Sequence, residues 1–121
     1  QRGGLLIRDR YGNNTLHHLV RSPHSSDKEE LIQRVDIVCR TQFIQLRRMG
    51  LFMLEDIPRY YLVHNLCSYV DHFPEDRFQF LVEWCPTSLV VHSAEDGWLP
   101  LHCAALSSSI EGFRTVFEYI I

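Results

Sequence analysis

Three histidines, His17, His64 and His102, have the side-chain type for metal binding or proton transfer. An imidazole can ligate a metal ion or act as a general base, because it gains and loses its proton near neutral pH. A zinc site needs three or four ligands that converge on one point. The histidines are 47 and 38 residues apart along the chain. Whether they could share a metal therefore depends on the elements that carry them.

A second candidate for chemistry is the pair His64 and Cys67, which lie three residues apart on one expected helix. A thiol beside an imidazole is the arrangement of a cysteine nucleophile with its base. The sequence shows no third group to orient the base, and no phosphate loop, paired-carboxylate motif or nucleophile elbow. The four cysteines are 28, 18 and 18 residues apart, unlike a zinc knuckle or a redox dithiol. We expect no enzymatic activity, no cofactor and no metal, and reduced thiols in an intracellular protein.

The segments around the three histidines align with one another. They run from Asp9 to Val20, from Asp56 to Cys67 and from Ala94 to Ala105, and their apolar columns match in register. A short apolar run precedes each segment, and a longer helical pattern follows each. This self-similarity predicts a repeat whose unit consists of a turn, a short helix, a loop and a longer helix.

Capping signals predict the bounds of the three longer helices. The first is expected to open at the capping box from Ser26 to Glu29. The second is expected to start near Pro74 and to stop before Pro86, since proline suits a helix start and breaks a helix interior. The third has Ser108 and Glu111 at capping-box spacing.

The third aligned segment resembles a known motif. Residues 97–105 read Gly-Trp-Leu-Pro-Leu-His-Cys-Ala-Ala, similar to the Gly-x-Thr-Pro-Leu-His-x-Ala-Ala signature of ankyrin repeats. The first segment follows the same pattern, with Asn14 and Thr15 at the Thr-Pro positions. In the second, Arg59 occupies the glycine column, so that turn is expected to be strained or reshaped. The surplus over an ordinary ankyrin unit of about 33 residues is expected in loops or in a long first outer helix.

The resemblance implies an all-α fold, an ankyrin-repeat solenoid of about three helix-turn-helix units. The expected divisions are residues 1–8 as the tail of a preceding unit, then units at 9–50, 51–88 and 89–121. In this family the histidine column is structural, and its imidazoles tie adjacent turns together through hydrogen bonds. The three rings would stand about 10 Å apart in a row, too far to share a metal. The last helix has no polar outer face, so further ankyrin repeats are expected in the same chain.

In such an array the turn tips and the exposed face of the inner helices bind the partner. Arginine, tyrosine and tryptophan are the residues most enriched in binding hot spots. The alternative for the aromatic tip residues is packing of turn on turn, which would itself stabilise the stack. The expected tip positions are Arg10, Tyr11, Asn13, Ile57, Pro58, Tyr60, Glu95, Asp96 and Trp98, and the expected helix-face positions are His18, Asn65 and Cys103.

Composition and charge argue against other classes of function. The chain has 121 residues, 45% hydrophobic and 22% charged, as in one small globular unit. Its longest stretch without a charged residue, from Gly97 to Ile110, is shorter than the roughly 20 residues of a membrane helix. We therefore expect no membrane partner. Residues 1–60 carry ten basic and seven acidic side chains, and residues 61–121 carry two and eight. We also expect no nucleic-acid partner, because no basic stripe with interleaved aromatics is present.

The sequence thus predicts a non-enzymatic module that binds a protein partner of unknown identity through its turn tips and the concave inner-helix face. A structural spacer inside a longer repeat array is the alternative from a different class of function. A metal- or thiol-dependent enzyme is a third.

Overall fold

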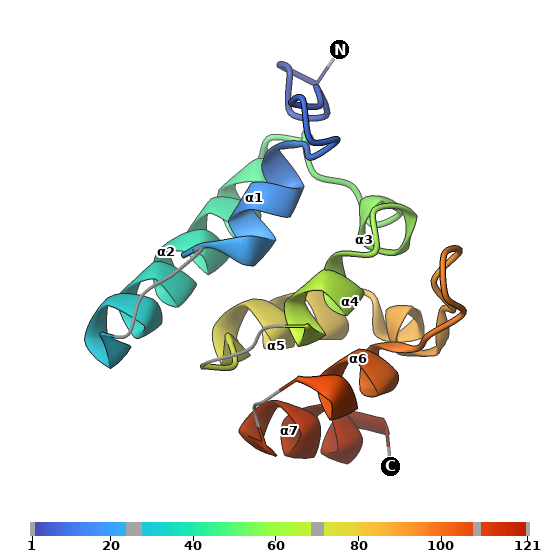
Figure 1. Cartoon of the computed structure of the whole chain (residues 1–121). Coiled ribbons are helices and arrows are strands. Elements are labelled where there is room, and N and C mark those ends of the chain that lie inside the picture. Colours follow the sequence, from blue (N-terminus) through green and yellow to red (C-terminus); the bar gives the residue numbers. More distant parts are fainter. Residues whose placement is uncertain (1, 24–27, 69–71, 108–109, 121) are drawn as a thin grey trace.

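The computed structural model describes residues 2–23, 28–68, 72–107 and 110–120. The regular structure in these ranges is helical, without any β-strand (Figure 1), so the predicted all-α class is confirmed. None of the helices found there has the length and apolar character needed to cross a bilayer. The elements are α1 (Thr15–Arg21), α2 (Glu29–Arg48), α3 (Asp56–Arg59), α4 (Leu62–Cys67), α5 (Glu75–Trp84), the 3-10 helix η1 (Pro86–Val90), α6 (Pro100–Leu106) and α7 (Ile110–Ile120).

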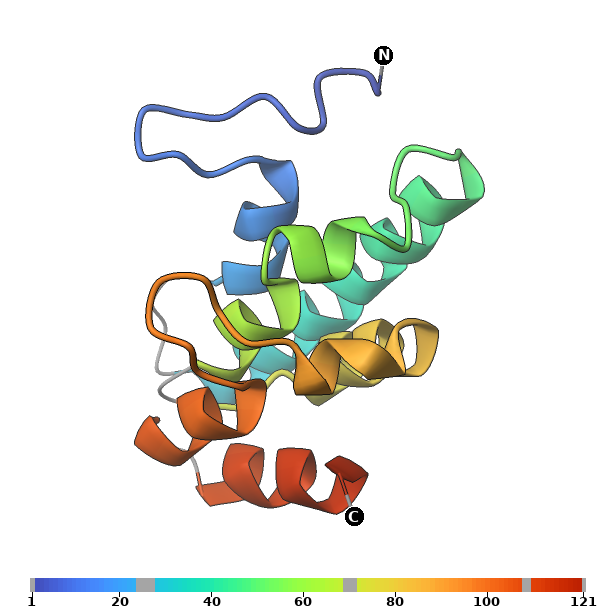
Figure 2. The same cartoon turned by 90° about the vertical axis from the view of Figure 1, so that its right-hand side faces the viewer.

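The helices form two layers. The short helices α1, α4 and α6 lie in a row, with α4 packed between the other two (Figures 1 and 2). The longer helices form the second layer, in which α2 packs on α5, while α7 packs on α6 and also contacts α4. Helix pairs α1–α2, α4–α5 and α6–α7 therefore follow one another along the stack, and each buries its apolar face against the next.

The outer helices match most of their predicted bounds. The first outer helix, α2, is 20 residues long, which accounts for part of the wide spacing between the first two histidines. It begins at Glu29, and the predicted cap residue Ser26 lies outside the described residues. Helix α5 begins directly after Pro74 and ends before Pro86, as predicted. The cap predicted at Ser108 also lies outside the described residues.

The turns confirm the expected glycine positions in the first and third units and differ in the second. Gly12 and Gly97 have φ angles of 83° and 74°, where glycine pays no steric penalty. Arg59 does not take up such a conformation. The chain instead forms the extra helical turn α3, and the left-handed conformation falls on Tyr61, with φ of 50°. A residue with a side chain is strained in the left-handed region. The turn without glycine is therefore reshaped, and the strained residue is Tyr61 instead of Arg59.

A buried ion pair joins the first helix pair to the second. Arg77 Nε lies 2.6 Å from Asp36 Oδ1, and both side chains are buried. The same carboxylate accepts the backbone N–H groups of Asp76 and Arg77, at 2.9 and 3.2 Å, in the first turn of α5. Arg77 Nη1 donates to the carbonyl oxygens of Leu19 and Val20, at 2.8 and 3.0 Å, near the end of α1. Each charge thus satisfies a helix terminus whose backbone groups have no intrahelical partner.

Removing one member of this pair is expected to destabilise the protein strongly. Arg77→Met leaves the Asp36 carboxylate buried without its cation, which costs about 3–5 kcal/mol in the free energy of unfolding. The double variant Arg77→Met/Asp36→Leu is expected to lose less than the sum of the single changes, because no isolated charge remains. Urea denaturation measures the free energy of unfolding of the single and the double variants.

Arg40→Met is the matched control, since Arg40 is exposed on the same helix as Asp36. It is expected to change stability by no more than about 0.5 kcal/mol. An Arg77 variant as stable as the Arg40 variant would contradict the structural role of the ion pair.

Candidate functional site

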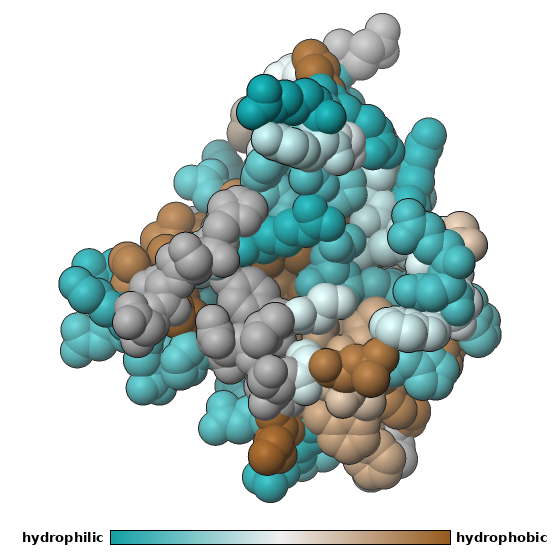
Figure 3. Space-filling view, in the orientation of Figure 1, coloured by the Kyte–Doolittle hydropathy of each residue, from teal (hydrophilic) through white to brown (hydrophobic). Residues whose placement is uncertain are grey.

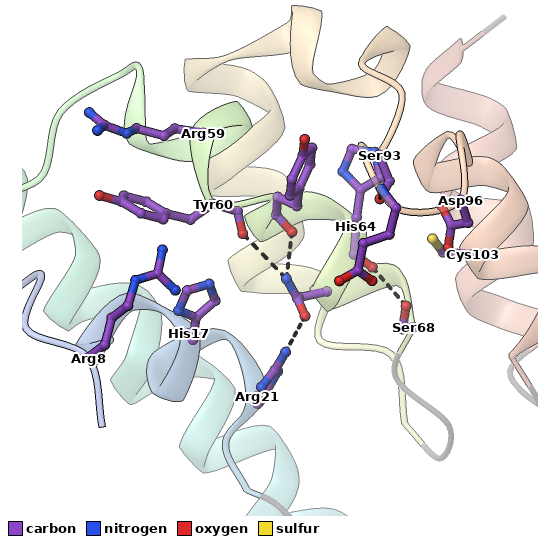
Figure 4. A pocket seen from close by; sticks show the side chains of 13 residues that line it. Arg8, His17, Arg21, Arg59, Tyr60, His64, Ser68, Ser93, Asp96 and Cys103 are labelled. Atoms are coloured by element: carbon purple, nitrogen blue, oxygen red, sulfur yellow. Dashed lines mark hydrogen bonds between the residues drawn. The ribbon is translucent and has the colours of Figure 1, made fainter. Parts of the chain in front are cut away.

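A polar pocket of about 450 Å³ lies on the inner layer, lined by residues of all three helix pairs (Figure 4). Its charges are separated. Arg8 lines it from the segment before α1, Arg21 from α1 and Arg59 from α3, while Glu95 and Asp96 line it from the turn before α6. A volume in this range suits a small molecule or a short piece of an extended chain. The pocket is therefore the strongest candidate for a binding site among the described residues.

Tyr60 forms the centre of the basic end. Its ring packs edge-on against the His17 imidazole, with the ring centroids 5.8 Å apart. The guanidinium carbons of Arg8 and Arg59 each lie 5.7 Å from the centroid of the Tyr60 ring, on opposite sides of it in Figure 4. These cation–π contacts hold both arginines at the pocket. Tyr60 is half-buried. Its exposed part can contact a partner, which is the predicted role, and its buried part packs between units, which is the alternative role.

Arg21 connects two predicted contact residues from different units. Its guanidinium donates to Asn13 Oδ1 at 2.7 Å and to Asn65 Oδ1 at 2.6 Å. Asn65 in turn donates to the Tyr61 carbonyl oxygen at 2.8 Å. Arg21 was not among the predicted contact residues. Its spacing of four residues from His17, which places both on one helix face, was the available signal.

The first turn lies beside the pocket and is largely exposed. Tyr11 is 74% exposed, and Arg10 stacks on it with its guanidinium carbon 5.0 Å from the ring centroid. His18 Nε2 lies 2.8 Å from Asp9 Oδ2, so these two side chains pair on the outside of α1. Arg10, Tyr11 and His18 are thus accessible, as predicted, but the structure does not bring them into the pocket.

The third turn is ordered by its own hydrogen bonds. Asp96 Oδ1 accepts the backbone N–H of Trp98 at 2.9 Å, and the Trp98 side chain is 40% exposed. The Tyr61 hydroxyl accepts the backbone N–H of Ala94 at 3.1 Å, which fixes this turn to the middle unit. Glu95 is exposed and lines the pocket.

The middle turn requires one correction. Ile57 was expected at an exposed tip, but its side chain is completely buried, because α3 turns it into the core. Pro58 is half-buried rather than exposed. Cys103 lines the pocket and is partly exposed, as its predicted helix-face position requires.

Each of the three histidine rings forms a hydrogen bond with a backbone group. His17 Nδ1 accepts the N–H of Asn14 at 3.0 Å, and His102 Nδ1 accepts the N–H of Leu99 at 2.9 Å, so both close the start of their own helix. His64 Nε2 donates to the carbonyl oxygen of Val91 at 2.7 Å, across to the next unit. The expected tie between adjacent turns is therefore made by His64, and the His17 ring, which caps its own helix, also interacts with the backbone of Tyr60 in the next unit. The His102 ring caps the start of its own helix.

The remaining chemistry candidates are buried or dispersed. Within the described part of the chain, no group of three or more His, Cys, Asp or Glu side chains is placed to hold a metal ion. Cys67 is completely buried, and burial raises its pKa, which disfavours the thiolate that a nucleophile requires.

Comparisons of the chain with protein-family models, with curated proteins and with solved structures found no match. The ankyrin resemblance stays a prediction.

Burial of two histidines predicts a pH-dependent stability. Burial lowers the pKa of both His17 and His64 below the ordinary value of 6.5, because the low-dielectric interior disfavours the imidazolium form. As the pH falls through 6.5, the unfolded chain binds more protons than the folded one, so the free energy of unfolding decreases. Urea denaturation at pH 7, 6 and 5 measures this loss.

The variant His17→Gln/His64→Gln is expected to lose part of that pH dependence. His92→Gln, which removes an exposed histidine, is the control. A double variant whose stability still falls with pH as steeply as that of the control would show that other groups cause the loss.

Proposed function

We propose that this chain is an ankyrin-type array of three helix pairs that binds a protein partner on its inner face, formed by the turn tips and helices α1, α4 and α6. The row of short helices, the positive φ angles of Gly12 and Gly97 and the placement of Pro100 as the first residue of α6 support this fold assignment. The partner is a protein, with neither nucleic acid nor membrane involved, and the chain itself performs no catalysis.

The observation that carries this proposal is the pocket that residues of all three units line together. Polar side chains cover much of the face around it, seen in Figure 3 in the orientation of Figure 1. Arginine and aromatic side chains gather at one end, and these are the residue types most enriched in binding hot spots. The exposed Tyr11 and Trp98 on the flanking turns extend this surface.

We also propose that a further helix pair of the same kind packs on α6 and α7 and that the protein is intracellular. His102 is exposed, whereas His17 and His64, at the corresponding positions, are buried where the next unit packs. The structure has four free cysteines, three of them buried, and free thiols are typical of intracellular proteins. The exposed large hydrophobic side chains of the last pair are Leu106, Ile110, Phe113, Phe117, Tyr119 and Ile120.

The second candidate function is a structural spacer. The packing of Tyr60 against His17 favours a structural role for Tyr60. Alanine substitutions separate the two functions. Tyr60→Ala is expected to lower the free energy of unfolding by about 1–2 kcal/mol, since a half-buried ring is lost. Tyr11→Ala/Trp98→Ala is expected to stay within about 1 kcal/mol of the parent protein, since both side chains are substantially exposed.

Photo-crosslinking amino acids at positions 11 and 98, incorporated in cells, test the binding role directly. We expect crosslinks to one protein from both positions, and lower affinity of that purified protein for Tyr11→Ala/Trp98→Ala. A crosslinker at Arg40, on the outer layer, is the control. Crosslinks from position 40 alone, or from neither tip, would favour the spacer.

A further inference from the structure

We propose that the pocket anchors an extended acidic segment of the partner, whose carboxylates are bound by Arg8 and Arg59. The acidic turn at Glu95 and Asp96 then fixes the direction of the segment, because it repels acidic residues at the opposite end. This inference rests on the proposed partner-binding function and specifies the chemistry of the partner.

The two arginines present positive charge that the described chain does not pair with a carboxylate. The ion pairs among the described residues involve Arg2, His18 and Arg77 instead. Arg8 donates to the carbonyl oxygen of Gly12 and lies over the Tyr60 ring. Arg59 is exposed and lies over the same ring. A guanidinium has five N–H donors, so a stacked arginine retains donors for a carboxylate in the plane of the group.

The geometry favours carboxylates over a single phosphate. Arg8 and Arg59 lie on opposite sides of the Tyr60 ring in Figure 4, each with its carbon 5.7 Å from the ring centroid. The ring separates the two groups, so each is suited to its own acidic side chain. In an extended chain, residues two apart point to the same side and lie about 6.6 Å apart, which lets two acidic side chains straddle one tyrosine.

The basic end is also held in place before a ligand arrives. Tyr60 packs on His17, which is fixed by its hydrogen bond to the backbone of Asn14. Side chains that are already ordered lose less conformational entropy on binding. The pocket volume of about 450 Å³ admits a few residues of an extended chain rather than a folded element.

The opposite end selects against acidic residues. Glu95 and Asp96 are exposed, and within the described residues neither forms an ion pair. A segment that crosses the pocket therefore meets positive charge first and negative charge afterwards. Like charges placed together suppress wrong registers and wrong partners.

Fluorescence anisotropy with labelled peptides tests the anchor. The probes are hexapeptides with two glutamates separated by one, two or three alanines, the same peptides with glutamine, and one with a single phosphoserine. For at least one spacing, we expect the glutamate peptide to bind at least tenfold more tightly than its glutamine control at low salt. Binding should weaken as the salt concentration rises, because exposed charges are screened.

Charge reversal identifies the residues. Arg8→Glu/Arg59→Glu is expected to weaken glutamate-peptide binding at least tenfold and to bind the corresponding lysine peptide instead. Arg40→Glu/Arg48→Glu makes the same change in net charge on the outer layer and should leave affinity within twofold. Circular dichroism verifies folding. Arg59→Glu alone is the second variant if the Arg8 change, which removes a hydrogen bond to Gly12, impairs folding.

Neutralising the opposite end tests the direction. Glu95→Gln/Asp96→Asn should bind peptides with an additional glutamate at either end more tightly than the parent protein does. Equal binding of glutamate and glutamine peptides would overturn the inference, as would an equal loss from the outer-layer reversal. Tighter binding of the phosphoserine peptide than of every glutamate pair would overturn the preference for carboxylates.

The crosslinking experiment keeps this inference separate from the proposed function. A partner that crosslinks at positions 11 and 98 but binds Arg8→Glu/Arg59→Glu as tightly as the parent protein would leave the function intact and refute the acidic anchor. Absence of crosslinks from the parent protein would count against the function itself.

Discussion

The buried contact between Asp36 and Arg77 constrains the position of three helices at once. It pairs two charges in the core, caps the start of α5 and satisfies carbonyl oxygens near the end of α1. Such a pair is costly to desolvate, so it persists only where each charge gains several hydrogen bonds. Because α1 and α5 are fixed through the same guanidinium, the first two helix pairs can meet in only one register.

That register determines the basic half of the pocket. His17 and Arg21 lie on α1, whereas Tyr60 and Asn65 belong to the middle unit, and their contacts cross the boundary between the two pairs. A shift between the pairs would separate the imidazole from the Tyr60 ring. The outer layer thus sets the geometry, and the inner layer presents the groups that contact a ligand.

The reshaped turn of the middle unit contributes to the same site. With arginine in the place of a turn glycine, the chain forms α3 and passes the left-handed conformation to Tyr61. This brings Arg59 and Tyr60 to the pocket and lets the Tyr61 hydroxyl bind the third turn. The departure from the repeat pattern, rather than the pattern itself, supplies the side chains that distinguish this surface.

Repetition explains what the sequence could predict. Local backbone preferences determine the turn glycines, the position of Pro100 at a helix start and the bounds of α5. The sequence predicts these features directly, because the glycine turns recur in the repeat and prolines mark the helix bounds. Asp36 and Arg77 lie outside the aligned segments, and their pairing depends on how α2 meets α5, so no column revealed it. Ile57 was misplaced for a related reason: a turn was expected where the chain forms a helix that faces inward.

The sharing of one pocket among three helix pairs has a consequence for how the array unfolds. In a linear stack, each pair is stabilised only by its neighbours, and an end pair can fray by itself. A ligand that contacts all three pairs loses contacts when any one of them opens, so its binding raises the free energy of opening at each pair that it contacts. Ligand binding would therefore couple the helix pairs, so that they unfold together as one cooperative unit instead of one by one.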